Sequence, residues 1–329
     1  MTKSVVVIGG TGLLGYHTVQ ELLRKGYGVT SLSLPPSPTP DLFPTEVENL
    51  LEDINELSNE QLSEIFAGKH AVFYAAGADE RIVPPVPASS FFYEQNVLPT
   101  ARIARLARAA GVKKFVLYGS YTAEFGEVWP ELGYRTRNGY PRTRLLQEEV
   151  AELEAGADMD VMTLRLPYIF GTMPGRLPLW QMFIDIVRSQ PEVVGVSGGK
   201  TSSVTVTQVA QAAVGAMEQG EHQGKYPINE YDLSHLEFHQ LVLEALGRDP
   251  QQAVVVPKEA MLPAMEQLDA QCAKDGVEHG IHLVDSLEFN QRDAVSEPAI
   301  TKAQLGYQDD DVVAAIKATL QYCLKNEQA

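Results

Sequence analysis

A tyrosine and an arginine four residues apart are the pair in this chain best suited to acid–base chemistry. Tyr140 and Arg144 lie in the stretch NGYPRTRLLQEE (residues 138–149), which predicts the start of a helix. Residues four apart share one face of a helix, so the phenol and the guanidinium are expected to lie together. A nearby cation favours the ionised form of a phenol, and arginine keeps its charge at every ordinary pH. The pair therefore predicts a tyrosine that exchanges a proton with a bound molecule, beside an arginine that cannot relay protons.

A simpler interpretation of Arg144 is a surface ion pair. Glu148 follows four residues later, and Arg–Glu pairs with this spacing are common on exposed helix faces, where they contribute little stability. Under this interpretation Arg144 belongs to the helix surface and Tyr140 lacks a charged partner.

Three glycines in the stretch GGTGLLG form a second candidate site. Gly9, Gly12 and Gly15 follow a continuous β-branched run at residues 4–9, which predicts a strand buried on both faces of a parallel sheet. In this context one glycine permits the tight turn, the next lets backbone approach a pyrophosphate, and the last lets helix and strand pack closely. The following helix presents free N–H groups to an anion. The pattern predicts a dinucleotide-binding loop; the alternative is a purely structural turn.

Two histidine pairs have spacings compatible with a metal site. His235 and His239 are four apart on a predicted helix, and His279 and His282 lie in EHGIH. Neither pair has an evident third ligand, so we expect helix packing or surface roles and no metal.

Strands and helices alternate through the first half of the chain. Apolar runs predict further strands at residues 28–34, 71–77, 114–119 and 160–166. Between them, one helix is predicted to end near Gly26, and a second to begin at a capping box formed by Ser58 and Gln61. A third is predicted from about Ser90 to Ala110. This rhythm predicts an α/β fold with a doubly wound parallel sheet.

The alternation weakens beyond residue 171. Helices are predicted there at residues 179–188, 206–217, 235–246, 257–274 and 311–324. We expect residues 1–170 to form a dinucleotide-binding domain. Residues 171–329 are expected to form mainly a smaller substrate-binding lobe, with some segments returning to the first domain.

The chain resembles the extended short-chain dehydrogenase/reductase family, which contains nucleotide-sugar epimerases, dehydratases and dihydroflavonol-type reductases. The stretches GGTGLLG, LEDIN, YAAG, LRLPYIFG and GYPRTRLLQEE carry this resemblance, which covers nearly the whole chain. It implies a Rossmann-like fold that binds NAD(P). It implies catalytic positions at Tyr140, Arg144, Ser120 and Thr122. The implied cofactor contacts are Gly9, Thr11, Gly12, Leu13, Leu14, Gly15, Ser33, Asp53, Ile54, Ala75, Ala76, Gly77, Asn96, Tyr140, Arg144, Pro167 and Ile169.

Two catalytic positions depart from the family's pattern. Its lysine, which lowers the tyrosine pKa and holds the nicotinamide ribose, is replaced by Arg144. The place of its serine falls on Tyr121, between Ser120 and Thr122. Either neighbouring hydroxyl is able to polarise a carbonyl, and either is equally suited to capping the end of the preceding strand.

Two binding positions also depart from it. At the end of the second strand, where NAD enzymes have an acidic residue for the ribose hydroxyls, this chain has Ser33. No basic residue lies between Lys25 and Lys69, so NAD and NADP are both left open. The arginine that usually binds a nucleotide-sugar diphosphate is missing from GGKTSS (residues 198–203), and Lys200 or Arg176 would have to replace it.

Composition indicates a globular protein and disfavours two classes of partner, nucleic acids and anionic membranes. Of 329 residues, 44% are hydrophobic, and the formal net charge is -17. Such a surface repels phosphate backbones and anionic membranes, so we expect neither as a partner. Cys272 and Cys323 form no disulfide framework, and no signal peptide or membrane span is evident, so a cytoplasmic location is expected.

The resemblance also implies a homodimer, in which the long helix and the helix of Tyr140 pack against their copies. An apolar stripe on the long helix is compatible with this arrangement, although the same stripe is equally compatible with facing the sheet. It consists of Val97, Ile103, Ala104, Ala107 and Ala110.

Three functions follow from these patterns. The first is an NAD(P)-dependent oxidoreductase acting on a small carbonyl or alcohol, with Tyr140 handling the proton. The second is a nucleotide-sugar epimerase or dehydratase. The third is a non-catalytic dinucleotide-binding regulator, which the altered serine and lysine positions motivate.

Overall fold

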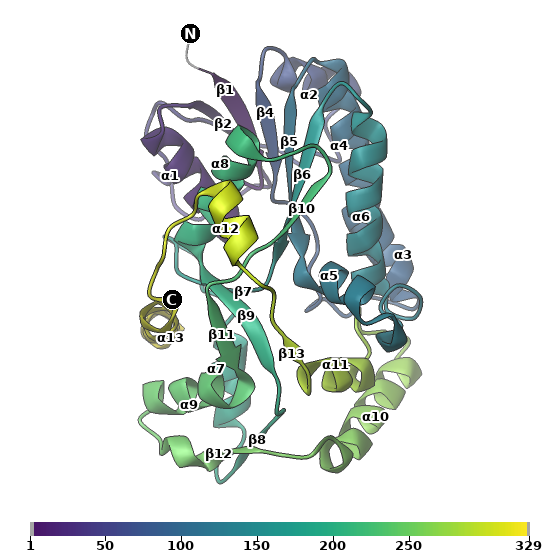
Figure 1. Cartoon of the computed structure of the whole chain (residues 1–329), viewed down its shortest axis with the longest axis vertical. Coiled ribbons are helices and arrows are strands. Elements are labelled where there is room, and N and C mark those ends of the chain that lie inside the picture. The colour runs from purple at the N-terminus through teal and green to yellow at the C-terminus, as the bar shows by residue number, and fades with distance from the viewer. Residues whose placement is uncertain (1–2, 328–329) are drawn as a thin grey trace.

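A seven-stranded parallel sheet forms the centre of the first half of the molecule (Figure 1). The computed structural model describes residues 3–327. The strands run in the order β10-β6-β5-β4-β1-β2-β3, so the connections change direction between β1 and β4. Their bounds are β1 (Ser4–Ile8), β2 (Gly28–Ser33), β3 (Glu48–Leu51), β4 (Ala71–Tyr74), β5 (Lys114–Ser120), β6 (Asp160–Leu166) and β10 (Gly224–Pro227). This is the doubly wound, Rossmann-like α/β fold that the sequence predicts.

Helices cover both faces of this sheet, because alternate residues of a buried strand point to opposite sides. Val5 and Val7 lie in one core layer, and Val6 and Ile8 lie in the other. The first layer is closed by α1 (Leu13–Arg24), α8 (Val206–Gln219) and α12 (Ala299–Leu305). The second is closed by α2 (Asn59–Phe66), α4 (Leu98–Ala109) and α6 (Gly139–Ala155).

The sequence patterns predict the central strands of the sheet but miss its two edge strands and most of the short strands of the second half, and one predicted helix is irregular. The predicted helix from Ser90 to Ala110 consists of α3 (Ala88–Phe92), a π-helical turn η1 (Tyr93–Val97) and α4. The sequence patterns did not predict β3 or β10, which lie at the two edges of the sheet. The capping box before α2 is confirmed, since Ser58 Oγ accepts the Gln61 N–H at 3.2 Å and Gln61 Oε1 accepts the Ser58 N–H at 2.8 Å.

A second lobe lies beyond the carboxyl ends of these strands (Figure 1). Its core contains Phe170, Trp180 and Phe238. The strands are β7 (Tyr168–Phe170), β8 (Val194–Val196), β9 (Lys200–Thr205), β11 (Tyr231–Ser234), β12 (Ala253–Val255) and β13 (Asp293–Ala294). The helices are α7 (Gln181–Arg188), α9 (His235–Ala245), η3 (Pro250–Gln252), α10 (Lys258–Lys274), α11 (Leu283–Asn290) and α13 (Val312–Asn326). Three elements of the second half, β10, α8 and α12, lie with the first sheet. The exact domain division at residue 170 stays a prediction.

The apolar stripe considered for a dimer interface lies inside the monomer. Val97, Ile103, Ala104 and Ala107 are each no more than 1% exposed, and the last three pack in the layer between α4 and the sheet. The interpretation of this stripe as an intersubunit contact is therefore wrong, because the sheet of the same chain covers it.

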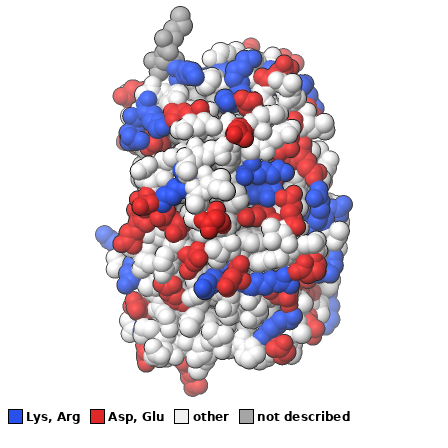
Figure 2. All heavy atoms as spheres, viewed as in Figure 1, with Lys and Arg blue, Asp and Glu red and all other residues white. Residues whose placement is uncertain are grey.

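Acidic and basic side chains are interspersed over the face shown in Figure 2. Within residues 3–327, no helix has the combination of length and apolarity that a membrane crossing requires.

Candidate active site

Two adjoining hollows lie at the carboxyl ends of the parallel strands, beside the point where the strand order reverses. Such switch points are where doubly wound sheets bind ligands. The first hollow is lined by Gly9, Gly12, Ser33 and Asp53, and we call it the dinucleotide groove. The second is lined by Tyr140 and Arg144, and we call it the Tyr140 pocket. Residues 75–78, which follow β4, line both, so the two hollows share one wall.

The glycine loop leaves its backbone and the first N–H groups of α1 accessible to a ligand. Gly9 has φ +83°, and Gly15 approaches it so closely that an added Cβ would lie 2.1 Å from Gly9 O. A Cβ on Gly12 would meet one atom within 4 Å, Gly9 O at 3.2 Å, and would otherwise stand free in the groove. Helix α1 begins directly after Gly12, and no side chain caps its first N–H groups. These uncapped donors suit the pyrophosphate of a dinucleotide.

Most of the other predicted cofactor residues line one or both hollows, and three of them line neither. Thr11, Ser33, Asp53 and Ile54 line the groove, and Leu14, Pro167 and Ile169 line the Tyr140 pocket; Ala75, Ala76 and Gly77 line both. Leu13, Gly15 and Asn96 line neither hollow.

Asn96 supports the groove from behind. It lies in the π-helical turn η1 and is fully buried. Its Oδ1 accepts the Ala78 N–H at 2.7 Å and its Nδ2 donates to Ala78 O at 3.0 Å. Gly77, with φ +147°, has no room for a side chain, because a Cβ would lie 2.7 Å from Asn96 Oδ1. Asn96 therefore fixes the strand end that forms the common wall of the two hollows.

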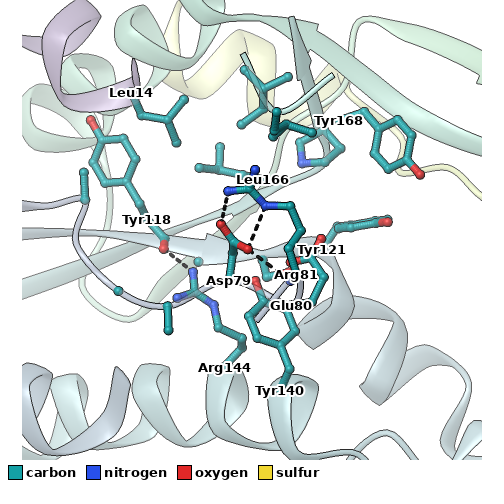
Figure 3. A pocket seen from close by; sticks show the side chains of 18 of the residues that line it. Leu14, Asp79, Glu80, Arg81, Tyr118, Tyr121, Tyr140, Arg144, Leu166 and Tyr168 are labelled. Carbon is teal, nitrogen blue, oxygen red and sulfur yellow. Dashed lines mark hydrogen bonds and ion pairs between the residues drawn. The ribbon is translucent and has the colours of Figure 1, made fainter. Parts of the chain in front are cut away.

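Tyr140 and Arg144 project from the first turns of α6 into one pocket (Figure 3). The Arg144 guanidinium carbon lies 5.8 Å from the centre of the Tyr140 ring. Tyr140 is held by its backbone N–H, which donates to Gly280 O at 2.8 Å, and by edge contact with Phe92 at 5.4 Å between ring centres. The segment around Gly280 belongs to the second lobe, so closure of that lobe over α6 positions the tyrosine.

The surface-pair interpretation of Arg144 is wrong. Glu148 instead forms a buried ion pair with Arg165 of β6, at 2.8 Å between Glu148 Oε2 and Arg165 Nη2. Arg144 is 7% exposed, and its Nη2 donates to the carbonyl oxygen of Tyr118. Its Nε is buried with no hydrogen-bond partner among the described residues. Enclosure keeps Nε from a ligand, so Nη1, which has no hydrogen-bond partner among the described residues, is the nitrogen left for an acceptor such as a ribose hydroxyl.

Burial controls the ionisation of Tyr140. Loss of contact with water raises the pKa of its phenol well above the usual value, and the nearby Glu80 carboxylate adds to this effect. Arg144 and the Ser120 hydroxyl lower the pKa, as expected of a cation and a hydrogen-bonding group, but they do not outweigh burial. The phenol is therefore protonated at neutral pH, as a proton donor must be.

Of the two candidate hydroxyls, only Ser120 lines the Tyr140 pocket. Its Oγ accepts the Thr122 N–H at 3.2 Å and lies 2.8 Å from Thr122 Oγ1. Ser120 thus caps α5 (Tyr121–Val128) while facing the pocket. Thr122 is 3% exposed and stands behind it. Tyr121, at the family's serine position, also lines the pocket.

Aromatic and apolar side chains of the second lobe form the far wall of this pocket. Local sequence carries no signal for them, because their place in the pocket depends on how the second lobe packs on the first. They are Tyr168, Leu179, Trp180, Met182 and Phe183.

The segment Asp79–Arg81, after β4, also lines the pocket (Figure 3). Arg81 is engaged by Asp79 through an ion pair and an Nε–Oδ1 hydrogen bond of 2.8 Å. Its position in the loop that follows a parallel strand is the sequence signal that marks such a segment.

Neither proposed substitute for the diphosphate arginine lies in the Tyr140 pocket. Arg176 lines the dinucleotide groove, and Lys200 is an exposed residue of β9 that lines neither hollow.

Two of the candidate histidines have local hydrogen-bond partners: His239 Nδ1 bonds His235 O at 2.7 Å, and His282 Nε2 bonds Glu278 Oε1 at 2.9 Å. Residues 3–327 contain no group of three or more side chains placed to hold a metal ion.

Comparison with known proteins identifies the family. The model of the NAD dependent epimerase/dehydratase family matches residues 5–229. The chain belongs to this family. Its members are NAD-dependent enzymes, so the resemblance and the expected NAD(P) cofactor are both confirmed.

Individual relatives act on different substrates. The chain is 21% identical to CDP-abequose synthase of Salmonella muenchen over 229 residues, which cover 69% of this chain and 74% of that enzyme. It is 29% identical to the decarboxylating sterol-4-alpha-carboxylate 3-dehydrogenase of Mus musculus over 237 residues, 67% of this chain and 60% of that enzyme. Its fold is similar to that of dTDP-glucose 4,6-dehydratase from Streptomyces venezuelae with NAD bound, with a TM-score of 0.69, 17% identity and 98% of each chain covered.

Proposed function

We propose that this chain is an oxidoreductase that moves hydride between NAD(P) and a small, largely apolar carbonyl or alcohol substrate. The observation that carries this proposal is the Tyr140 pocket, where a protonated phenol and a guanidinium meet beside apolar walls. The bound nicotinamide would supply or accept the hydride. Tyr140 would give its proton to the substrate oxygen during reduction, and Ser120 would orient that oxygen.

Arg144 would take over the binding role of the missing lysine. Of its three nitrogens, Nη2 donates to Tyr118 O and Nε is enclosed, which leaves Nη1 for a ribose hydroxyl. Its permanent charge favours the phenolate that forms after proton transfer. It cannot carry the proton onward, so Tyr140 must regain a proton from water or another group.

The pocket lining supports an apolar substrate. The lining includes Leu179 and Met182, apolar residues that are 38% and 40% exposed. A nucleotide sugar would need a cation for its diphosphate. The basic residues of the described pocket are Arg81, which Asp79 engages, and Arg144. The mouse relative that acts on a sterol is in keeping with such a substrate.

Two alternatives remain. A nucleotide-sugar epimerase or dehydratase is favoured by the relatives that act on such sugars. A non-catalytic dinucleotide-binding regulator is favoured by the altered positions Tyr121 and Arg144.

Binding of NADH and NADPH should be titrated by fluorescence. Oxidation of the cofactor that binds more tightly should then be followed by absorbance in the presence of apolar ketones and aldehydes. Consumption with these carbonyls supports the proposal. Tight binding of a nucleoside diphosphate supports the first alternative, and cofactor binding without turnover of any compound supports the second.

Variants of Arg144 should separate the effect of its charge from the effect of its hydrogen-bonding geometry on turnover and cofactor affinity. We expect Arg144→Ala to weaken both turnover and cofactor affinity by about tenfold or more, because a buried charged donor is lost. Arg144→Lys should keep or improve activity, whereas Arg144→Gln should retain affinity better than turnover. Steady-state kinetics and NAD(P)H titrations of the three variants would measure this. If Arg144→Ala matches the parent in both, the arginine is not part of the site.

We propose that the chain forms a homodimer through the outer faces of α4 and α6. Leu98 is 48% exposed and Leu153 is 78% exposed on these faces, which suits an isologous contact. We expect light scattering at micromolar concentration to give a dimer mass for the parent and a monomer mass for Leu153→Asp. Ile300, 77% exposed on α12, offers a matched control. Ile300→Asp should remain dimeric, and a monomeric parent would contradict the proposal.

A further inference from the structure

An arginine from the second half of the chain reaches the glycine loop. Arg176 Nε donates to Thr11 O at 2.9 Å, across 165 residues of sequence. The loop that carries it is anchored on the first lobe, since His17 Nε2 bonds Thr172 O at 2.9 Å. Gly175 has φ +71°, and a Cβ there would lie 2.6 Å from Pro38 O. Glycine at this position lets the loop approach the segment after β2, which brings Arg176 into the dinucleotide groove.

Arg176 adjoins the residue that usually determines cofactor choice. The N–H of Thr11 donates to Ser33 Oγ at 3.0 Å, so the backbone of one residue links the end of β2 to the arginine. Both Ser33 and Arg176 line the groove. Of the described groove residues Arg176 alone is basic, and it forms no ion pair within residues 3–327.

We propose that Arg176 binds the 2′-phosphate of NADP(H) and makes this chain select NADP(H) over NAD(H). In doubly wound folds an acidic residue at the end of the second strand binds the 2′-hydroxyl of NAD, and a nearby arginine accommodates the 2′-phosphate of NADP. Here the acidic residue is absent, because Ser33 occupies its place, and the arginine arrives from the other lobe. A guanidinium binds phosphate oxygens in a planar, two-point contact. The inference rests on the proposed cofactor site but not on the proposed reaction.

Two carboxylates share the groove with this arginine, but neither forms an ion pair with it within residues 3–327. They belong to Glu52 and Asp53. Asp53 Oδ1 accepts the Asn55 N–H at 2.8 Å, so one of its oxygens already has a partner. Arg176 Nε is directed at the Thr11 carbonyl, and its two terminal nitrogens have no hydrogen-bond partner among the described residues. They are the donors available to a phosphate.

The test compares ligands that differ only in the 2′-phosphate. Calorimetric titration should be carried out with 2′,5′-ADP and 5′-AMP, and fluorescence titration with NADPH and NADH. The variants are Arg176→Gln, which removes the charge, and Arg176→Lys, which keeps it. Lys200→Gln is the matched control, since it removes one charge from the second half of the chain outside the groove. Thermal unfolding of each variant verifies folding, and Arg176 is exposed enough for substitution without disturbing a core.

The parent should bind 2′,5′-ADP and NADPH more tightly than 5′-AMP and NADH. Arg176→Gln should weaken 2′,5′-ADP and NADPH by about tenfold or more while 5′-AMP and NADH are unchanged. Arg176→Lys should recover part of this loss, and Lys200→Gln should behave as the parent. Equal weakening of NADH and NADPH would assign Arg176 to the pyrophosphate and overturn the proposal, as would no change at all. If every binding result is as expected but no carbonyl is turned over, the proposed reaction fails and this inference stands.

Discussion

Tyr140→Phe is expected to lower turnover by about 10²- to 10⁴-fold, the range typical for loss of a positioned general acid. The Tyr140 phenol is protonated and lies beside Arg144, and phenylalanine keeps the ring that packs against Phe92. Cofactor affinity should therefore be nearly unchanged. The measurement is steady-state kinetics on the best carbonyl substrate, together with an NAD(P)H titration.

Tyr121→Phe is the matched control for this experiment. It removes a second phenol from the same pocket, at a position that lacks the Arg144 contact. We expect a much smaller loss. If Tyr121→Phe abolishes turnover and Tyr140→Phe does not, the acid is Tyr121 and the proposed mechanism is wrong.

The pH dependence follows from the direction of the Tyr140 pKa. Because burial raises this pKa, the phenol stays protonated through neutral and mildly alkaline pH. The reduction rate should not fall there through ionisation of Tyr140, whereas alcohol oxidation, which needs the phenolate, should rise with pH. Arg144→Gln should move that rise to higher pH, because the cation that favours the phenolate is gone.

Gly12→Val is expected to abolish dinucleotide binding while the chain remains folded. A side chain at Gly12 would extend into the groove, where its nearest obstacle is Gly9 O at 3.2 Å from the Cβ. It would occupy the space through which backbone approaches a pyrophosphate. Titration with NADH and NADPH should show no saturation, and the midpoint of thermal unfolding should be close to that of the parent.

Gly15→Val should act differently, and the contrast tests the interpretation of the loop. A Cβ at Gly15 would lie 2.1 Å from Gly9 O and 2.7 Å from Gly10 Cα, so backbone must move. We expect a lower unfolding midpoint as well as lost binding. Unchanged affinity of Gly12→Val for both cofactors would show that the ligand does not lie against this loop.

Several features of this protein follow from local sequence. The β-branched run at residues 4–9, the three glycines and the capping box at Ser58 each act through neighbouring residues, so their structures were predictable. The proximity of Tyr140 and Arg144 was also predictable, because helical periodicity sets it. The edge strands β3 and β10 were not predicted. Each has one partner strand, and their exposed and partly buried residues lack the continuous apolar pattern of the central strands.

The tertiary structure determines which of several possible partners each of these side chains contacts. Glu148 pairs with Arg165 instead of Arg144 because β6 lies beside α6 and offers a buried guanidinium. The stripe with Ile103 faces the sheet because the same chain covers it. Arg176 reaches the glycine loop because the second lobe folds back onto the first, a contact across 165 residues. Spacing along the chain defines neighbours within one helix or strand, whereas these choices depend on contacts between elements far apart in sequence.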